Sequence, residues 1–291
     1  MIIVTDSERK IRLPFSRGGI LTRSITLAGI DVGIATPSRL KSRKSSNGRG
    51  KKSVTTEEIR ELTYQKLLEK GLREEAKRYL FWRELRRRKV RLTVLLGGAT
   101  GVGKSTIATE LAFRLGIRSI IGTDTIREVM RKIIAKELLP DIHVSSFLAE
   151  RVVKAPKNSD PLIYGFETQV KHVSVGIKAV LERARREGLN TLIEGIHVVP
   201  GFVEPREDEF MYVIAVPKKD YLIAHFYERA RYSQRDAEKY VKHVDRIMRI
   251  QDYLVERARE YGIPVIENVE LESTVSTILA DMMKKLEEMG V

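Results

Sequence analysis

The sequence predicts an α/β domain with a parallel sheet covered by helices on both faces, preceded by a small, mostly helical domain. From Arg91 onward, short apolar runs alternate with longer segments whose apolar residues recur at helical spacing, as in parallel-sheet proteins. Lysine and arginine outnumber aspartate and glutamate by 23 to 10 in residues 1–90, but only by 30 to 29 in residues 91–291. This change of charge places the predicted boundary between two domains, residues 1–90 and 91–291.

The composition limits the classes of protein that need to be considered. Of the 291 residues, 42% are hydrophobic and none is cysteine, so we expect a substantial core without disulfides, thiolate metal sites or a cysteine nucleophile. No apolar run approaches the ~18 residues of a membrane span, and the first residues lack the layout of a secretory signal. We therefore expect a cytoplasmic protein with no membrane partner. Charged residues reach 32%, which favours a thermophilic source.

The first predicted domain consists of a short hairpin-like segment and two helices. Thr55 or Thr56 can cap the first helix, and Gly71 can end it. The second helix is predicted at residues 73–88. Residues 41–52 are basic and rich in glycine and serine, which predicts an exposed loop.

The second predicted domain alternates strands and helices. Its predicted strands are residues 92–96, 119–122, 191–193, 211–216 and 264–266. Helices lie between and after them, and two apolar stripes, at residues 173–184 and 275–286, are predicted core. Because parallel strands end at one edge of a sheet, residues that directly follow these strands are candidates for ligand binding.

Residues 98–105 follow the first of these strands and read Gly-Ala-Thr-Gly-Val-Gly-Lys-Ser, which matches the phosphate-binding loop pattern G-x-x-x-x-G-K-[ST]. Glycines let backbone N–H groups surround an anion, and the following helix directs its positive dipole end at the phosphates. Lys104 is predicted to reach the β- and γ-phosphates, and Ser105 to complete the shell of a Mg²⁺ ion. The predicted ATP-binding residues are Gly98, Ala99, Thr100, Gly101, Val102, Gly103, Lys104, Ser105 and Thr106.

Two further strand ends carry carboxylates. Asp124 follows the second predicted strand, where it can accept the proton of an acceptor hydroxyl or hold Mg²⁺ through water. Arg127, one helical turn later, can bind an anionic group of the substrate. Glu194 ends the third strand at the Walker-B-type position, where it can serve Mg²⁺ together with Ser105 or act as base. The sequence leaves open which carboxylate is the base, and a helix cap or a plain strand-end charge would also explain them.

Four basic residues gather on a polar helical stretch after the fourth predicted strand: His225, Arg229, Arg231 and Arg235. Small-molecule kinases use arginines of such a lid to neutralise the transferring phosphoryl group, so the three arginines are predicted to be catalytic. A solvated face paired with nearby acidic residues is the alternative.

Together these motifs resemble the archaeal 2-phosphoglycerate kinases. The similarity continues through two longer segments, Asp-Pro-Leu-Ile-Tyr-Gly-Phe-Glu-Thr-Gln at residues 160–169 and Ile-Glu-Gly-Ile-His-Val-Val-Pro-Gly at residues 193–201. Residues 1–90 look like an ATP-cone, a small helical nucleotide-binding module. The segments that carry this likeness are residues 13–24, 54–60 and 78–82.

The resemblance implies a P-loop kinase fold and a reaction of ATP with 2-phosphoglycerate that gives ADP and 2,3-bisphosphoglycerate. In methanogens this product leads to cyclic 2,3-diphosphoglycerate. Related kinases place a substrate-binding insertion between the second and third strands, which makes Glu167 and Gln169 candidate acceptor contacts beside Asp124 and Arg127. His197 is a further candidate, since residues at strand ends face the site.

Other functions remain open at this point. The acceptor could be another small anionic alcohol, because one P-loop scaffold serves many of them. A nucleotide-dependent regulator that binds nucleic acid through the basic first domain is a second alternative, although no recognition-helix or RNA-platform motif occurs. The first domain could bind a regulatory nucleotide, or be a structural or oligomerisation module.

Overall fold

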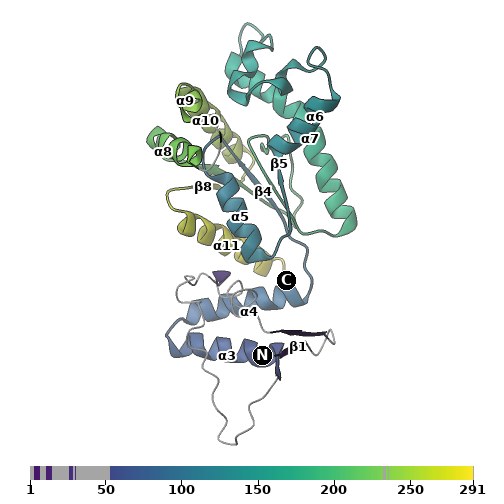
Figure 1. Cartoon of the computed structure of the whole chain (residues 1–291), viewed down its shortest axis with the longest axis vertical. Coiled ribbons are helices and arrows are strands. Elements are labelled where there is room, and N and C mark those ends of the chain that lie inside the picture. The colour runs from purple at the N-terminus through teal and green to yellow at the C-terminus, as the bar shows by residue number, and fades with distance from the viewer. Residues whose placement is uncertain are drawn as a thin grey trace, which may run out of the picture. The chain divides into compact units, whose positions relative to one another are not determined.

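The computed structural model describes residues 3–6, 11–14, 26–28, 30, 53–231, 234 and 236–290. The chain divides into two compact units, residues 1–90 together with 283–291, and residues 91–282 (Figure 1). Within these described segments, no helix has both the length and the apolar character needed to cross a membrane.

The described part of the first unit combines a small mixed sheet with two helices. Strand β1 (Ile3–Asp6) pairs antiparallel with β2 (Ile11–Pro14) and parallel with β3 (Ser53–Thr55). Helices α3 (Thr56–Glu69) and α4 (Arg73–Arg87) follow. The hairpin-like segment and both helices are therefore confirmed, whereas the pairing of β3 was not predicted. The predicted loop at residues 41–52 lies outside the described residues.

A capping box fixes the start of α3. The Thr55 hydroxyl accepts a hydrogen bond from the Glu58 backbone N–H at 3.1 Å, and the Glu58 carboxylate accepts one from the Thr55 N–H at 2.9 Å. This reciprocal pair satisfies two N–H groups that no earlier helical turn could serve. Of the two threonines considered, Thr55 is thus the cap.

The second unit is built on five parallel strands in the order β5–β6–β4–β7–β8. Their bounds are β4 (Thr93–Gly98), β5 (Ser119–Gly122), β6 (Thr191–Glu194), β7 (Phe210–Ala215) and β8 (Val265–Glu267). All five predicted strands are confirmed within two residues, as is the parallel α/β fold. The central position of β4 explains its composition, because all six of its residues are buried.

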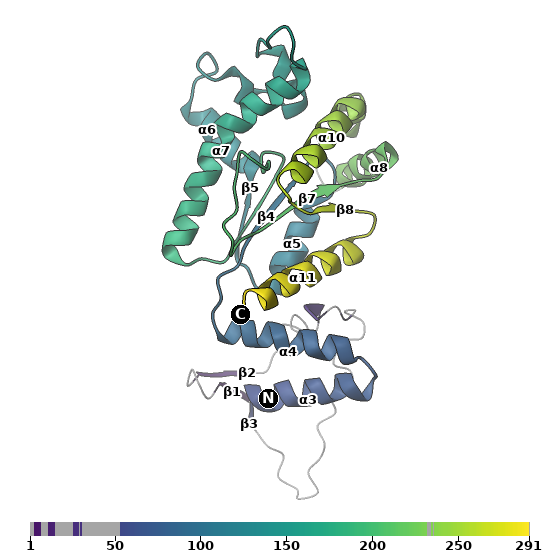
Figure 2. The ribbon, with the colours of Figure 1, turned by 180° about the vertical axis from the view of Figure 1, so that it is seen from behind.

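Helices lie on both sides of this sheet (Figures 1 and 2). They are α5 (Lys104–Leu115), α6 (Thr123–Ile133), α7 (Pro161–Glu187), α8 (Lys219–Ala230), α9 (Ala237–Val241), α10 (Val244–Glu260) and α11 (Leu271–Glu288). Two short 3₁₀ helices, η2 (Pro140–His143) and η3 (Ser146–Arg151), occupy the connection between α6 and α7. The sheet and its helices make the three layers expected of a P-loop kinase.

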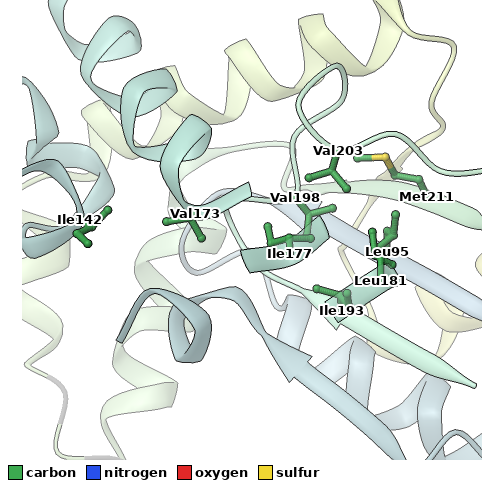
Figure 3. Close-up of a cluster of buried hydrophobic side chains, with 9 residues drawn as sticks. All are labelled: Leu95, Ile142, Val173, Ile177, Leu181, Ile193, Val198, Val203 and Met211. Carbon is green, nitrogen blue, oxygen red and sulfur yellow. The ribbon is translucent and has the colours of Figure 1, made fainter. Parts of the chain in front are cut away.

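One hydrophobic core cluster of the second unit lies between the sheet and α7 (Figure 3). Leu95 of β4 stands in register with Ile193 of β6 and Met211 of β7, so these three side chains share one face of the sheet. Val173 and Ile177 of α7 are fully buried against that face. Each such side chain contributes roughly 1.5–3 kcal/mol on burial. The stripe predicted at residues 173–184 is therefore core.

The topology brings distant segments to one edge. Since the five strands are parallel, their carboxyl ends coincide, and the segments that leave those ends meet there. The phosphate-binding loop follows β4, helix α6 follows β5, Gly195 follows β6, and Asn268 follows β8. This edge is where the candidate site forms.

Candidate active site

The loop of residues 98–103 has the backbone of an anion-binding loop. Gly98, Gly101 and Gly103 adopt positive φ angles of 144°, 92° and 92°. A Cβ atom on Gly101 would overlap the ring of Phe226, and one on Gly103 would overlap the Asn268 side chain. Both backbone conformation and close packing therefore require glycine at these two positions.

Lys104, the first residue of α5, points back into this loop. Its ammonium group is buried and donates to the Ala99 carbonyl at 2.7 Å. Burial lowers the pKa of Lys104, while the carboxylates of Glu194 and Asp124 act in the opposite direction. A cation held at a helix N-terminus beneath a glycine loop is suited to phosphate oxygens.

Ser105 and Glu194 come together from α5 and the end of β6. The Ser105 hydroxyl donates to Glu194 Oε1 at 3.0 Å. Hard oxygen ligands of this kind suit Mg²⁺, which keeps several waters and takes further ligands from substrate phosphates. In the described part of the chain, no group of three or more His, Cys, Asp or Glu side chains could hold a metal ion.

A cavity of about 810 Å³ opens over the loop. Its lining includes Thr100, Gly101, Gly103, Lys104, Ser105 and Thr106 from the predicted ATP-binding residues, and Asp124, Glu194 and Arg229 from the other strand ends and α8. Gly98, Ala99 and Val102, the other predicted ATP-binding residues, are buried and absent from the described lining. The cavity thus collects the phosphate loop, three carboxylates (Asp124, Glu194 and Glu228) and the guanidinium of Arg229 around one space.

Asp124 and Arg127 lie one helical turn apart at the start of α6, and Asp124 but not Arg127 belongs to the described lining of the cavity. Asp124 lines the cavity with its side chain 60% exposed, and Arg127 Nη2 lies 3.3 Å from its Oδ1 atom. Arg127 is mostly buried and also donates from Nη1 to the Val144 carbonyl at 2.9 Å. The guanidinium is thereby held in one orientation beside the carboxylate.

The predicted lid residues differ in their placement. His225 and Arg229 of α8 line the cavity, and His225 Nδ1 donates to the Gly101 carbonyl at 2.8 Å. Arg231, directly after α8, is exposed and is absent from the described lining. Arg235 lies outside the described residues.

Like Arg127, three further predicted acceptor contacts are absent from the described lining of the cavity. Glu167 accepts a hydrogen bond from the Tyr253 hydroxyl at 2.6 Å. Gln169 and His197 are fully buried, and His197 Nε2 lies 3.0 Å from Gln169 Oε1. The structure therefore joins these last two to each other rather than to the cavity.

Sequence reasoning missed the loop after β8. Asn268 lines the cavity, and its Nδ2 atom donates to the Val102 carbonyl at 2.9 Å. Thr274 donates to Asn268 Oδ1 at 3.0 Å, so the amide is held at both ends. Val269 and Leu271 complete this side of the lining. The available signal was the position of Asn268 two residues after the fifth predicted strand, residues 264–266.

The chain is similar to curated proteins over its whole length. No family model matches the chain. It is 95% identical over 291 residues to the 2-phosphoglycerate kinase of Thermococcus kodakarensis, covering the whole of both chains. It is 60% identical to that of Pyrococcus furiosus, covering 99% of this chain and 95% of the relative. A solved structure of shikimate kinase from Acinetobacter baumannii aligns with 68% of this chain and 97% of that one, at 17% identity and a TM-score of 0.42.

A more distant relative also matches over nearly the whole chain. The 2-phosphoglycerate kinase of Methanothermobacter thermautotrophicus is 39% identical over 288 residues, covering 96% of this chain and 93% of the relative. Similarity of this extent includes residues 1–90 as well as the cavity-bearing unit. The chain belongs to the archaeal 2-phosphoglycerate kinase family.

Proposed function

We propose that this enzyme transfers the γ-phosphoryl group of Mg·ATP to the hydroxyl of 2-phosphoglycerate, giving ADP and 2,3-bisphosphoglycerate. The observation that carries the proposal is the cavity in which a phosphate loop faces Asp124, Arg127 being held beside that carboxylate. The names of the relatives support the identity of the acceptor.

The phosphates of ATP would lie in the glycine loop. Backbone N–H groups and Lys104 would bind the β- and γ-phosphates, with the Lys104 ammonium exchanging the Ala99 carbonyl for phosphate oxygens. Ser105 and Glu194 would hold Mg²⁺, whose chemistry when bound is to neutralise phosphate charge. Val269 and Leu271, which are 57% and 37% exposed, offer apolar surface in the cavity lining on which the base of the nucleotide would pack.

The acceptor would approach from the α6 side. Its hydroxyl oxygen attacks the γ-phosphorus, the bond from phosphorus to the β–γ bridging oxygen breaks, and the hydroxyl proton passes to Asp124. We assign the base to Asp124 because Glu194 is already engaged with Ser105. Arg127 and Arg229 would bind the anionic groups of the acceptor and the transferring phosphoryl group.

We also carry forward from the ATP-cone resemblance the proposal that the first unit binds a regulatory nucleotide. The full-length match to the relatives supports a shared role for this unit. Binding would favour one state of the enzyme, so the rate would depend on ATP or dATP at concentrations different from those that saturate the cavity. Use of ATP is consistent with a cytoplasmic location.

The direct test measures ADP release by the full chain with Mg·ATP at elevated temperature, comparing 2-phosphoglycerate, 3-phosphoglycerate, glycerate and no acceptor. We expect ADP release with 2-phosphoglycerate only, and ³¹P NMR should show two phosphomonoester signals of the product. ADP release with none of these acceptors, or at equal rates with all of them, would refute the proposed acceptor. Turnover with another anionic alcohol would then identify the alternative substrate.

A further inference from the structure

The side-chain amide of Gln169 is the centre of a buried hydrogen-bond network. Its Oε1 atom accepts from Ser146 Oγ at 2.6 Å and faces His197 Nε2 at 3.0 Å. Its Nε2 atom donates to the carbonyls of Asp141 and Val144, the latter at 3.1 Å. An amide can make two donations and two acceptances, so Gln169 is fully satisfied and its orientation is determined by its neighbours.

This arrangement also decides the proton position on His197. Because Gln169 Oε1 only accepts, His197 Nε2 must carry the proton, and Nδ1 accepts from the Thr123 hydroxyl at 3.0 Å. Burial, together with the neighbouring Arg127 guanidinium, lowers the pKa of His197 to about 3. The imidazole is therefore neutral at physiological pH, with one nitrogen donating and the other accepting.

One end of the network reaches the start of α6. Thr123 immediately precedes Asp124, which lines the cavity. The Thr123 side chain also packs on Gly195, where a Cβ atom would overlap it. Since Gly195 directly follows Glu194, the bond from His197 to Thr123 holds the two carboxylate-bearing strand ends against each other.

The other end reaches Arg127. The Val144 carbonyl accepts from Gln169 Nε2 and from Arg127 Nη1, so one oxygen anchors both side chains. Arg127 in turn lies beside Asp124. Both neighbours of the Asp124 carboxylate, Thr123 along the chain and Arg127 across the helical turn, are thus tied to the same buried amide.

We propose that Gln169 is a positioning residue that sets the Asp124–Arg127 pair through the Val144 carbonyl and through His197 and Thr123. The inference rests on the proposed function, since it assigns this pair to the acceptor. Gln169 does not touch the cavity and acts only through these groups. This positioning role explains why a buried position of α7 holds a glutamine rather than an apolar side chain of the same size.

The experiment compares Gln169→Met with a matched control, Gln251→Met. Methionine keeps the volume of glutamine but makes none of its hydrogen bonds. Gln251 is also buried, and its amide bonds the N–H and carbonyl of Val216 at 2.9 and 3.0 Å, away from α6. Both variants lose a buried amide, so a purely structural role predicts similar effects on melting temperature and on kinetics.

For Gln169→Met we expect the KM of the acceptor to rise about tenfold or more, because the Arg127 guanidinium is then misaligned with the anionic group of the acceptor. The KM of ATP should change less than about twofold. Gln251→Met should leave both KM values unchanged. A wild-type acceptor KM in Gln169→Met would overturn the inference, as would equal increases in both KM values.

A second measurement needs neither a variant nor an acceptor. Side-chain ¹⁵N NMR of the full-length protein should show His197 protonated on Nε2 alone from pH 5 to 8. Protonation on Nδ1, or titration within that range, would overturn the inference. If the wild type releases no ADP with 2-phosphoglycerate, the proposed acceptor fails. The KM comparison is then made with the acceptor that does react and still decides on the role of Gln169, while the histidine spectrum tests its hydrogen bond to His197.

Discussion

Replacement of Asp124 by Asn tests the roles assigned to Asp124 and Glu194, two carboxylates that line the cavity. The change keeps the size and one oxygen of the side chain but removes its ability to accept a proton. The pairing with Arg127 lies at 3.3 Å with the Asp124 side chain 60% exposed. A pair this exposed contributes about 0–1 kcal/mol, so the fold and acceptor binding should change little.

The expected fall in kcat follows from the role of Asp124 as a general base. A positioned general base contributes about 10²–10⁴-fold to rate, which corresponds to about 2.7–5.5 kcal/mol of barrier. We therefore expect kcat of Asp124→Asn to fall by about that factor, while the acceptor KM stays within about fivefold of wild type. The matched control is Asp220→Asn, since Asp220 is also an exposed acid in the first turn of a helix, α8.

The assay measures initial rates of ADP release as a function of acceptor and of Mg²⁺, with Glu194→Gln run in parallel. Glu194→Gln should raise the Mg²⁺ concentration needed for half-maximal rate, because the Ser105–Glu194 pair loses its charge. Asp124→Asn should leave that Mg²⁺ requirement unchanged. The opposite pattern, a changed Mg²⁺ requirement in Asp124→Asn alone, would reverse the assignment. A kcat within about threefold of wild type in Asp124→Asn would refute its role as base.

Three further predictions concern the loop and the fold. Lys104→Met should lower kcat by about 10²–10³-fold or more with an unchanged melting temperature, and near-normal turnover would mean that the site lies elsewhere. Gly101→Ala should weaken ATP binding measured by calorimetry, because the added methyl group overlaps Phe226; unchanged affinity would contradict this loop geometry. Glu209→Gln should cost about 3 kcal/mol at neutral pH in chemical denaturation, since the buried carboxylate is bonded by Arg185 at 2.6 and 2.8 Å. Burial raises the pKa of Glu209, but the hydrogen bonds from the arginines lower it by a larger amount, so the folded pKa lies below the unfolded value of about 4.3. The stabilisation by this carboxylate is therefore present above the unfolded pKa and is lost as pH falls through the folded pKa. The stability difference between wild type and Glu209→Gln should shrink below that pH, and a constant difference would contradict the argument.

The sequence by itself determined the features that are local. The phosphate loop is a contiguous pattern whose glycines, lysine and serine act within eight residues, so its place after a strand could be recognised without coordinates. The five strands were likewise recognisable from short apolar runs. Asp124 and Glu194 could be predicted as site residues because the carboxyl ends of parallel strands meet at one edge.

Only the tertiary structure decided which side chains of the later segments reach the cavity. Gln169 and His197 occur in motifs that resemble those of the family, yet they are 28 residues apart and are buried against each other. Asn268 reaches the loop across 166 residues of sequence. Whether a polar side chain faces a cavity or a buried partner depends on the packing of helices over the sheet. A local sequence pattern does not predict that packing, because the hydrogen-bond partner that satisfies a buried polar group lies elsewhere in the chain.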